Sequence, residues 1–269
     1  MIYLKLQVLI STMNLKNAKS LIDKMNISTE SIIVNQCTEK NIKLLNEKKE
    51  KYVLYSFYEK GLSKSRNKAI KYSNADICVI ADDDMTYLDN YEYIIKKAYK
   101  KYKDADIIAF YVESAPNSVR KKKKLKEGKL GYLSSLKVQS VQVTFKKNSI
   151  VNNNISFDEL YGAGTDNYMG EENIFLYDCL KKGLKIYSVP QKIAYLHDGE
   201  STWFRGFDKK YLEVKGAMFY RMSKLFFGIF ILQFALRHSD LFKPDYSKFQ
   251  MIRYMINGKN KVKKSKKVV

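Results

Sequence analysis

Proline, glycine and cysteine are all scarce in this chain of 269 residues. Three prolines and twelve glycines exclude a collagen-like or low-complexity chain, and 45% apolar residues argue against disorder along the whole length. The three cysteines are odd in number and show no paired spacing (Cys37, Cys78 and Cys179), which excludes a disulfide scaffold and a cysteine-based zinc site. Residues 1–10 lack the layout of a secretory signal, because Lys5 interrupts their apolar run. We therefore expect a cytoplasmic protein.

Long apolar runs are also missing, although one charge-free segment lies near the C-terminus. Residues 225–236 contain no charge and are bounded by Lys224 and Arg237. A helix needs about 20 apolar residues to cross a bilayer, so this segment is too short to span one. It is either an amphipathic anchor in the membrane interface or a buried helix that closes over the sheet. Because many lysines surround it, we expect peripheral contact with an anionic membrane through residues 217–267, at the inner face of the cell membrane.

Positive charge is in excess and is unevenly distributed. The chain has 49 Lys and Arg against 28 Asp and Glu, a net charge of +21. Residues 203–269 carry a net +12 and residues 120–129 a net +6, which leaves the rest of the chain nearly neutral. A nucleic-acid-binding protein that uses these two regions is one alternative. Such a protein has basic and aromatic residues across its folded face, so the near-neutral main body argues against a nucleic-acid partner.

The first two-thirds of the chain alternates between short apolar runs and helix-like segments. We expect strands at 4–10, 31–34, 52–57, 76–81, 106–112 and 138–145, two short strands near Ile186 and Ala194, and helices at 17–25, 63–72, 89–102 and 171–182. Ser63 is the expected N-cap of its helix. This alternation predicts an α/β fold with a mixed, mostly parallel sheet flanked by helices. A shift in composition near Trp203 divides the chain into residues 1–202 and a basic, aromatic-rich helical region at 203–269.

Three aspartates directly follow the apolar strand at 76–81. In open α/β sheets, ligands bind outside the carboxyl ends of the strands. The adjacent carboxylates of Asp82, Asp83 and Asp84 repel one another unless a cation or strong hydrogen-bond donors compensate. Asp82 and Asp84 suit a hard divalent ion such as Mn²⁺ or Mg²⁺, which prefers oxygen ligands and can bridge to phosphates. The alternative is a solvated acidic turn.

Three further segments are candidates for a functional site. Residues 61–67 open a helix, where backbone N–H groups and Arg66 suit a diphosphate, although a simple turn and cap fits as well. Glu171 and Glu172 start another helix; they either favour the helix dipole or include a general base. His197 follows a short strand and is either structural or a ligand of a metal or phosphate.

Six short motifs follow one another in a specific order within residues 4–202. They are Ser11–Asn14, Ile33–Thr38, Gly61–Asn67, Asp82–Asp84, Phe157–Glu159 and Gly170–Asn173. In this order they resemble a family 2 glycosyltransferase of the GT-A fold, of the bacterial capsular, exopolysaccharide or cell-wall type. Members of that family transfer a sugar from a nucleotide diphosphate sugar, usually with inversion at the anomeric carbon. The resemblance implies a Rossmann-like domain that binds a nucleotide sugar.

The resemblance also implies residues that bind the donor. Thr12 would lie beside the nucleoside, and Arg66 would lie near the nucleotide. Asp82 and Asp84 match the Asp-x-Asp motif, which holds the ribose and the diphosphate-bound metal, Mn²⁺ or Mg²⁺. Asp83 lies between them and is assigned to the same cofactor-binding group. We expect the donor to be a UDP-sugar.

The resemblance assigns the catalytic step to the glutamates that begin the helix at 171–182. Glu172 matches the catalytic base, which deprotonates the acceptor hydroxyl, and Glu171 is a supporting residue. His197 resembles a late histidine that approaches the metal or diphosphate in some members. The sequence departs from the family at residues 35–38, where Asn-Gln-Cys-Thr replaces the usual Asp-Asn-Gly-Ser and alters the customary contact to the base.

These assignments predict an inverting, metal-dependent hexosyl- or hexosaminyltransferase. A processive synthase is disfavoured, because the sequence has no Gln-x-x-Arg-Trp motif and no multi-span membrane region. The expected acceptor is a hydroxyl of a lipid-linked glycan in surface polysaccharide biosynthesis. A sugar nucleotidyltransferase is a second alternative, which uses the same sheet and carboxylates but gives no role to residues 170–173.

Overall fold

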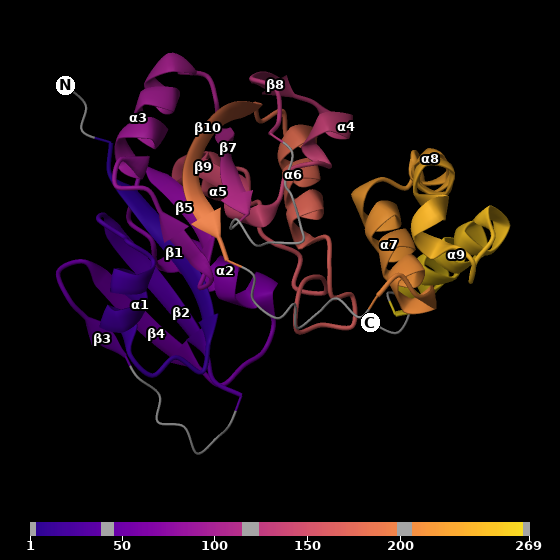
Figure 1. Ribbon diagram of the computed structural model, residues 1–269, viewed down its shortest axis with the longest axis horizontal. Coiled ribbons are helices and arrows are strands. Elements are labelled where there is room, and N and C mark those ends of the chain that lie inside the picture. The colour runs from indigo at the N-terminus through magenta and orange to yellow at the C-terminus, as the bar shows by residue number, and fades with distance from the viewer. Residues whose placement is uncertain (1–3, 39–45, 115–123, 198–205, 266–269) are drawn as a thin grey trace.

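The computed structural model describes residues 4–38, 46–114, 124–197 and 206–265 (Figure 1). The strands are β1 (Leu6–Met13), β2 (Glu30–Gln36), β3 (Glu47–Lys48), β4 (Tyr52–Phe57), β5 (Ile77–Asp82), β6 (Met85–Tyr87), β7 (Ile107–Ser114), β8 (Gly128–Leu130), β9 (Val143–Lys146) and β10 (Ile186–Leu196). The α-helices are α1 (Ala18–Lys24), α2 (Leu62–Tyr72), α3 (Tyr91–Lys101), α4 (Tyr132–Ser135), α5 (Lys147–Asn152), α6 (Glu171–Lys181), α7 (Lys209–Met222), α8 (Phe227–His238) and α9 (Lys248–Ser265). Short 3₁₀ helices lie at Ser140–Gln142 and Ser239–Phe242.

The strands form one mixed sheet in the order β3-β4-β2-β1-β5-β9-β7-β10-β6, with β8 paired to β10. Strands β4, β2, β1 and β5 are parallel neighbours, whereas β9 runs antiparallel between β5 and β7. The carboxyl ends of the four parallel strands therefore lie along one edge, where α/β sheets bind ligands. This arrangement confirms the predicted mixed, mostly parallel sheet.

Helices cover both faces of the sheet, because side chains alternate between the faces along each buried strand. In β1, Val8 and Ile10 face a core that includes residues of α1 and α3. Leu9, between them, faces a second core that includes residues of α2, α5 and α6. Near-continuous apolar sequence in these strands is therefore explained by burial on two sides.

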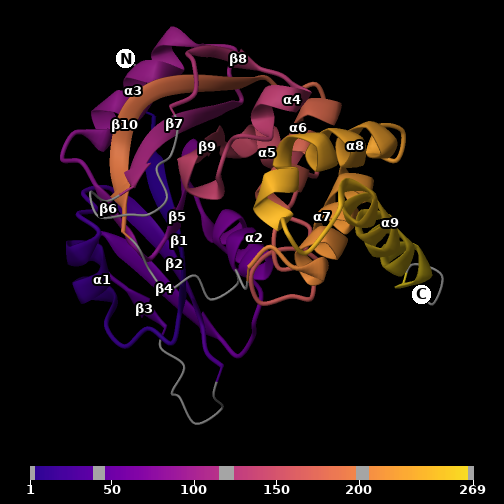
Figure 2. The ribbon, with the colours of Figure 1, turned by 45° about the vertical axis from the view of Figure 1, so that its right-hand side comes forward.

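Helices α7, α8 and α9 gather beside α6, at one side of the molecule (Figures 1 and 2). Their core also includes Tyr161, as well as Ile174 and Tyr177 of α6. Helices α7 and α9 cross at close range because Gly216 and Gly258 have no side chain. A Cβ atom on Gly216 would lie 2.0 Å from the carbonyl oxygen of Met255. The predicted division of the chain at 202–203 lies outside the described residues, as do the basic residues 120–123 and 266–267.

The structure corrects three local predictions. The two short strands expected near residues 186 and 194 are the single strand β10, whose register against β7 shifts around Pro190 because proline has no N–H to donate. The strand expected at 138–145 is confined to β9, after a 3₁₀ turn. Ser63 is not an N-cap: α2 begins one residue earlier with Gly61 as its N-cap, and the buried Ser63 hydroxyl donates to the carbonyl oxygen of Tyr161 at 2.7 Å.

Candidate active site

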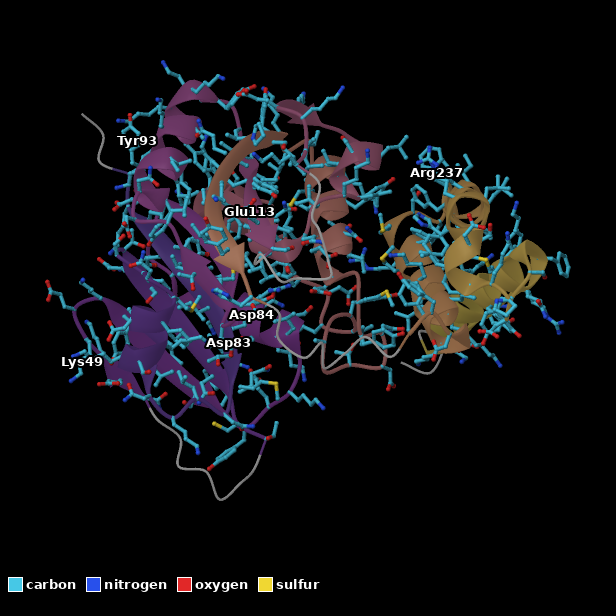
Figure 3. All side chains as sticks on the ribbon, in the orientation of Figure 1. Lys49, Asp83, Asp84, Tyr93, Glu113 and Arg237 are labelled. Carbon is cyan, nitrogen blue, oxygen red and sulfur yellow. The ribbon has the colours of Figure 1, made fainter. Side chains whose placement is uncertain are left out.

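The predicted donor-binding residues meet where β1 and β5 end. Thr12 Oγ1 donates a hydrogen bond to Asp83 Oδ2 at 2.5 Å, which ties the two strand ends together. The backbone N–H of His197 donates to the carbonyl oxygen of Asp84 at 2.9 Å, so the end of β10 lies at the same place. Figure 3 shows Asp83 and Asp84 near the middle of the molecule, far from Arg237 on α8. The fold therefore brings together Thr12, the aspartates and His197.

Arg66 connects these aspartates to the glutamates of α6. Its side chain is 1% exposed, and its Nη2 donates to Asp82 Oδ1 at 3.0 Å while its Nη1 donates to Glu171 Oε1 at 2.8 Å. Ser140 Oγ accepts a further bond from Nη2 at 3.0 Å, and the guanidinium lies 5.4 Å from the ring centroid of Phe157. Burial opposes the charge, but attraction to both carboxylates outweighs it and raises the pKa of Arg66. Arg66 thus links the end of β5, through Asp82, to the start of α6, through Glu171.

The two glutamates of α6 have different surroundings. Glu171 is buried in its ion pair with Arg66. Burial raises the pKa of Glu172 to about 8; repulsion by Glu171 adds to this, while attraction to Arg66 and Lys215 opposes it. A carboxyl group whose pKa is shifted toward neutrality by its surroundings suits a general base. The contrast favours Glu172 for proton transfer and Glu171 for support.

A glycine sets the position of these glutamates. Gly170, the N-cap of α6, has φ of 91°, a left-handed conformation that glycine adopts without strain. A Cβ atom on Gly170 would lie 2.3 Å from the sulfur of Met218, so α7 packs directly against the start of α6. The C-terminal helices therefore form part of the wall beside Glu172, which sequence reasoning did not predict.

The motif at residues 61–67 holds the fold together around this site. The first N–H of α2, from Leu62, donates to the carbonyl oxygen of Ala163 at 2.9 Å. Asn67 exchanges two hydrogen bonds with the backbone of Phe157, each 2.9 Å long. These contacts fasten α2 to residues 157–163, so the side chains of this motif have structural partners besides any role in binding a diphosphate.

Asn35 stands where the family usually has an aspartate that contacts the base. It is buried, and its Oδ1 accepts a hydrogen bond from the backbone N–H of Leu15 at 2.8 Å. Its amide nitrogen donates to Ser56 Oγ at 3.2 Å. The asparagine therefore joins β1, β2 and β4 at the edge where the nucleoside is predicted to bind.

The carboxylate oxygens of this site are suitable ligands for Mg²⁺ or Mn²⁺. The described part of the chain contains no group of three or more His, Cys, Asp or Glu side chains placed to hold a metal ion. Asp82 is paired with Arg66, and Nε2 of His197 is hydrogen-bonded to Thr86 Oγ1 at 2.8 Å. Mg²⁺ is commonly held by one or two carboxylates together with substrate phosphates. The residues fit an ion of that kind, with Asp84 as the carboxylate that Arg66 does not bind.

Comparison with known proteins gives a family match and several structural likenesses. The sequence model described as Glycosyl transferase family 2 matches residues 15–164. No curated protein matches the sequence.

Among the similar solved structures are those of a protein of S. aureus. S. aureus TarS 1-349 has a TM-score of 0.63 at 13% identity, covering 94% of this chain and 80% of that one. The same protein in complex with UDP scores 0.61 at 11% identity, covering 90% and 75%. Its complex with UDP-GlcNAc scores 0.62 at 11% identity, covering 97% and 92%. At this identity the likeness concerns the fold, and it confirms the predicted GT-A fold over most of the chain.

Proposed function

Because the chain belongs to glycosyl transferase family 2, we propose that it is an inverting, metal-dependent and non-processive hexosyl- or hexosaminyltransferase. The donor is a UDP-sugar, and the acceptor is a hydroxyl of a lipid-linked glycan in surface polysaccharide biosynthesis. The UDP and UDP-GlcNAc complexes of the similar TarS fold support this class of donor. The observation that carries the proposal is the unequal glutamate pair of α6, which Arg66 links to the aspartates at the end of β5.

In the proposed reaction, Glu172 accepts the proton of the acceptor hydroxyl as its oxygen attacks the anomeric carbon. The bond from that carbon to the diphosphate breaks, and UDP leaves. Thr12 lies beside the nucleoside. Asp82 and Asp84, with Asp83 between them and His197 nearby, would hold a Mn²⁺ or Mg²⁺ ion, which would supply positive charge against the departing diphosphate. Glu171 and Arg66 keep the start of α6 in place, so that the base and the acceptor stay oriented.

The first test measures release of UDP from a set of UDP-sugars with Mn²⁺ present. We expect release that excess chelator abolishes and that added Mn²⁺ restores.

A variant of the metal site gives a second measurement. Mutation of a residue that merely supports a metal ligand lowers metal affinity or activity by about 10–100-fold. Asp84→Asn is therefore expected to raise the Mn²⁺ concentration for half-maximal activity at least about tenfold. Asp240→Asn, at an exposed position, is the matched control and is expected to behave as wild type. Full activity in excess chelator would show that the reaction needs no metal.

We also propose that α8 contacts the surface of an anionic membrane. Within the described ranges, no helix is both long and apolar enough to cross a bilayer. Helix α8 has two apolar faces: Phe227, Phe230, Ile231 and Ala235 are buried against α7 and α9, whereas Ile229, Leu232 and Leu236 are exposed, as is Leu225 just before the helix. The exposed stripe has helical spacing, and exposed cations Lys224 and Arg237 lie at its two ends. An apolar stripe with flanking cations fits the interface of a membrane that contains anionic lipid.

The membrane test is co-sedimentation with vesicles of zwitterionic lipid, with and without anionic lipid. We expect binding that needs the anionic lipid and that weakens at least about tenfold in an Ile229→Glu/Leu232→Glu variant, which removes two apolar contacts. Leu133→Glu on α4 is the matched control, because Leu133 and Ile229 are both 61% exposed. If wild type does not bind vesicles but the double variant changes the oligomeric state, the stripe is an interface between copies of the chain and the membrane proposal is wrong.

A further inference from the structure

Lys215 of α7 lies in an aromatic environment beside the proposed base. Its ammonium is 5.9 Å from the ring centroid of Tyr211, 5.8 Å from that of Phe219 and 5.8 Å from that of Phe234. The first two rings belong to α7 and the third to α8, so two helices of the C-terminal region build this environment. Aromatic faces attract a cation at such distances, more strongly where water is excluded.

The packing of α7 places the turn that carries Lys215 beside the start of α6. Met218 lies one turn after Lys215 on the same face of α7, and its sulfur contacts Gly170, two residues before Glu172. The hydroxyl of Tyr161 donates to the carbonyl oxygen of Ala217 at 3.1 Å, which fastens the same turn of α7 to the catalytic region. These two contacts place the turn of α7 that carries Lys215 beside the start of α6, where Glu172 lies.

Electrostatics connect the two side chains. Burial lowers the pKa of Lys215, and attraction to Glu172 opposes that effect. Attraction to Lys215 in turn opposes the rise in the pKa of Glu172. Burial, and then the charge of Glu172, raise the pKa of Tyr211 on the same helix. The charge of Glu172 thus acts on two groups of α7, Lys215 and Tyr211.

We propose that Lys215 is a positioning residue for the general base: its ammonium, held among three rings, faces Glu172 and stabilises the carboxylate in its proton-accepting form. Among the described residues, the charges of Glu171 on α6 and Arg66 on α2 also act on the pKa of Glu172, and the charge of Lys215 acts on the pKa of His238 on α8. The inference rests on the proposed function, since it takes Glu172 as the base. It makes the C-terminal helices a part of the active site.

The test is the pH profile of kcat/KM for Lys215→Met in the full chain. Methionine can pack among the rings but carries no charge. The pKa of Glu172, which burial and Glu171 raise, then lacks the opposing attraction to Lys215 and rises further. An opposite charge nearby shifts a carboxyl pKa by about 1–3 pH units, so we expect the acid limb of the profile to move upward by at least about one pH unit. Activity below the limb then falls about tenfold, whereas Lys215→Arg, which keeps the charge and can stack on rings, keeps the wild-type limb.

The outcomes separate this inference from the proposed function. An unchanged acid limb in Lys215→Met, with Glu172→Gln inactive, would overturn the role of Lys215 and leave the proposed base in place. Full activity of Glu172→Gln would instead overturn the base itself. A purely structural role predicts lower kcat at every pH with the limb unmoved. If Lys215→Met does not fold, Lys215→Gln supplies the same comparison with a polar, neutral side chain.

Discussion

Glu172→Gln is expected to lower turnover by about 10²–10⁴-fold, the usual effect of removing a general base, while donor affinity stays near wild type. The amide has nearly the same shape but cannot accept the proton of the acceptor hydroxyl. Because the pKa of Glu172 is raised to about 8 by burial and by Glu171, activity of the wild type should rise with pH through that region. Steady-state kinetics and donor binding, each measured from pH 6 to pH 9, check both statements.

Glu171→Gln is the matched control for this result. Its carboxylate is held by Arg66, so we expect a lower stability and a smaller loss of turnover than in Glu172→Gln. An inactive Glu171→Gln beside a nearly normal Glu172→Gln would reverse the assignment within the pair.

Stability against pH gives a second measurement for the same variant. A carboxyl group whose pKa is higher in the folded chain than in the unfolded chain lowers the stability of the fold once it ionises. The loss begins as pH rises above the pKa in the unfolded chain, and it is complete above the pKa in the folded chain. For Glu172 that window runs from its ordinary value of 4.5 to about 8. Glu172→Gln removes this loss, so its melting temperature should exceed that of wild type by more at pH 8 than at pH 5.

Arg66→Met is expected to lower the free energy of unfolding by about 3–5 kcal/mol, the range for removing one partner of a buried ion pair. Its guanidinium is the cation between Asp82 and Glu171, and without it both carboxylates lose a charged hydrogen-bond donor. Urea unfolding at neutral pH measures the change. Activity should fall as well, because Asp82 and the start of α6 lose their common anchor.

Arg221 offers a matched control for Arg66. It also bridges two aspartates, Asp158 and Asp178, but its side chain is 27% exposed. Water reaches Arg221 more than Arg66, so Arg221→Met should cost less than Arg66→Met, about 1–3 kcal/mol. Equal losses in the two variants would mean that burial does not distinguish the two arginines, and the proposed role of Arg66 as the buried link would fail.

Most of the fold and the position of the site could be predicted from local sequence. The apolar runs of β1 and β5 are buried on both faces, and runs of that kind alternating with helices predict a parallel sheet. Asp82 ends such a run, so the rule that ligands bind at the carboxyl ends of strands assigns it to the candidate site. The order of motifs predicted the family, because spacing along the chain is a property of the sequence itself.

Local sequence could not show which of two adjacent glutamates is paired. Glu171 and Glu172 have the same chemistry and the same helix start, yet Arg66, 105 residues earlier in the chain, binds one and not the other. Nor did the charge-free segment at 225–236 reveal that α8 is buried on one face and exposed on the other. The spacing of apolar residues indicates which face of a helix can be buried, but it does not indicate which distant segment covers that face.

By itself, therefore, the sequence determined the α/β architecture, the family and the edge of the sheet where the aspartates meet. Only the tertiary structure decided that Arg66 joins Asp82 to Glu171, and that rings of α7 and α8 surround Lys215 in the region of Glu172. The physical reason is that a strand or helix follows from the pattern of its own residues, whereas the charge state of a buried group depends on every neighbour that folding places around it.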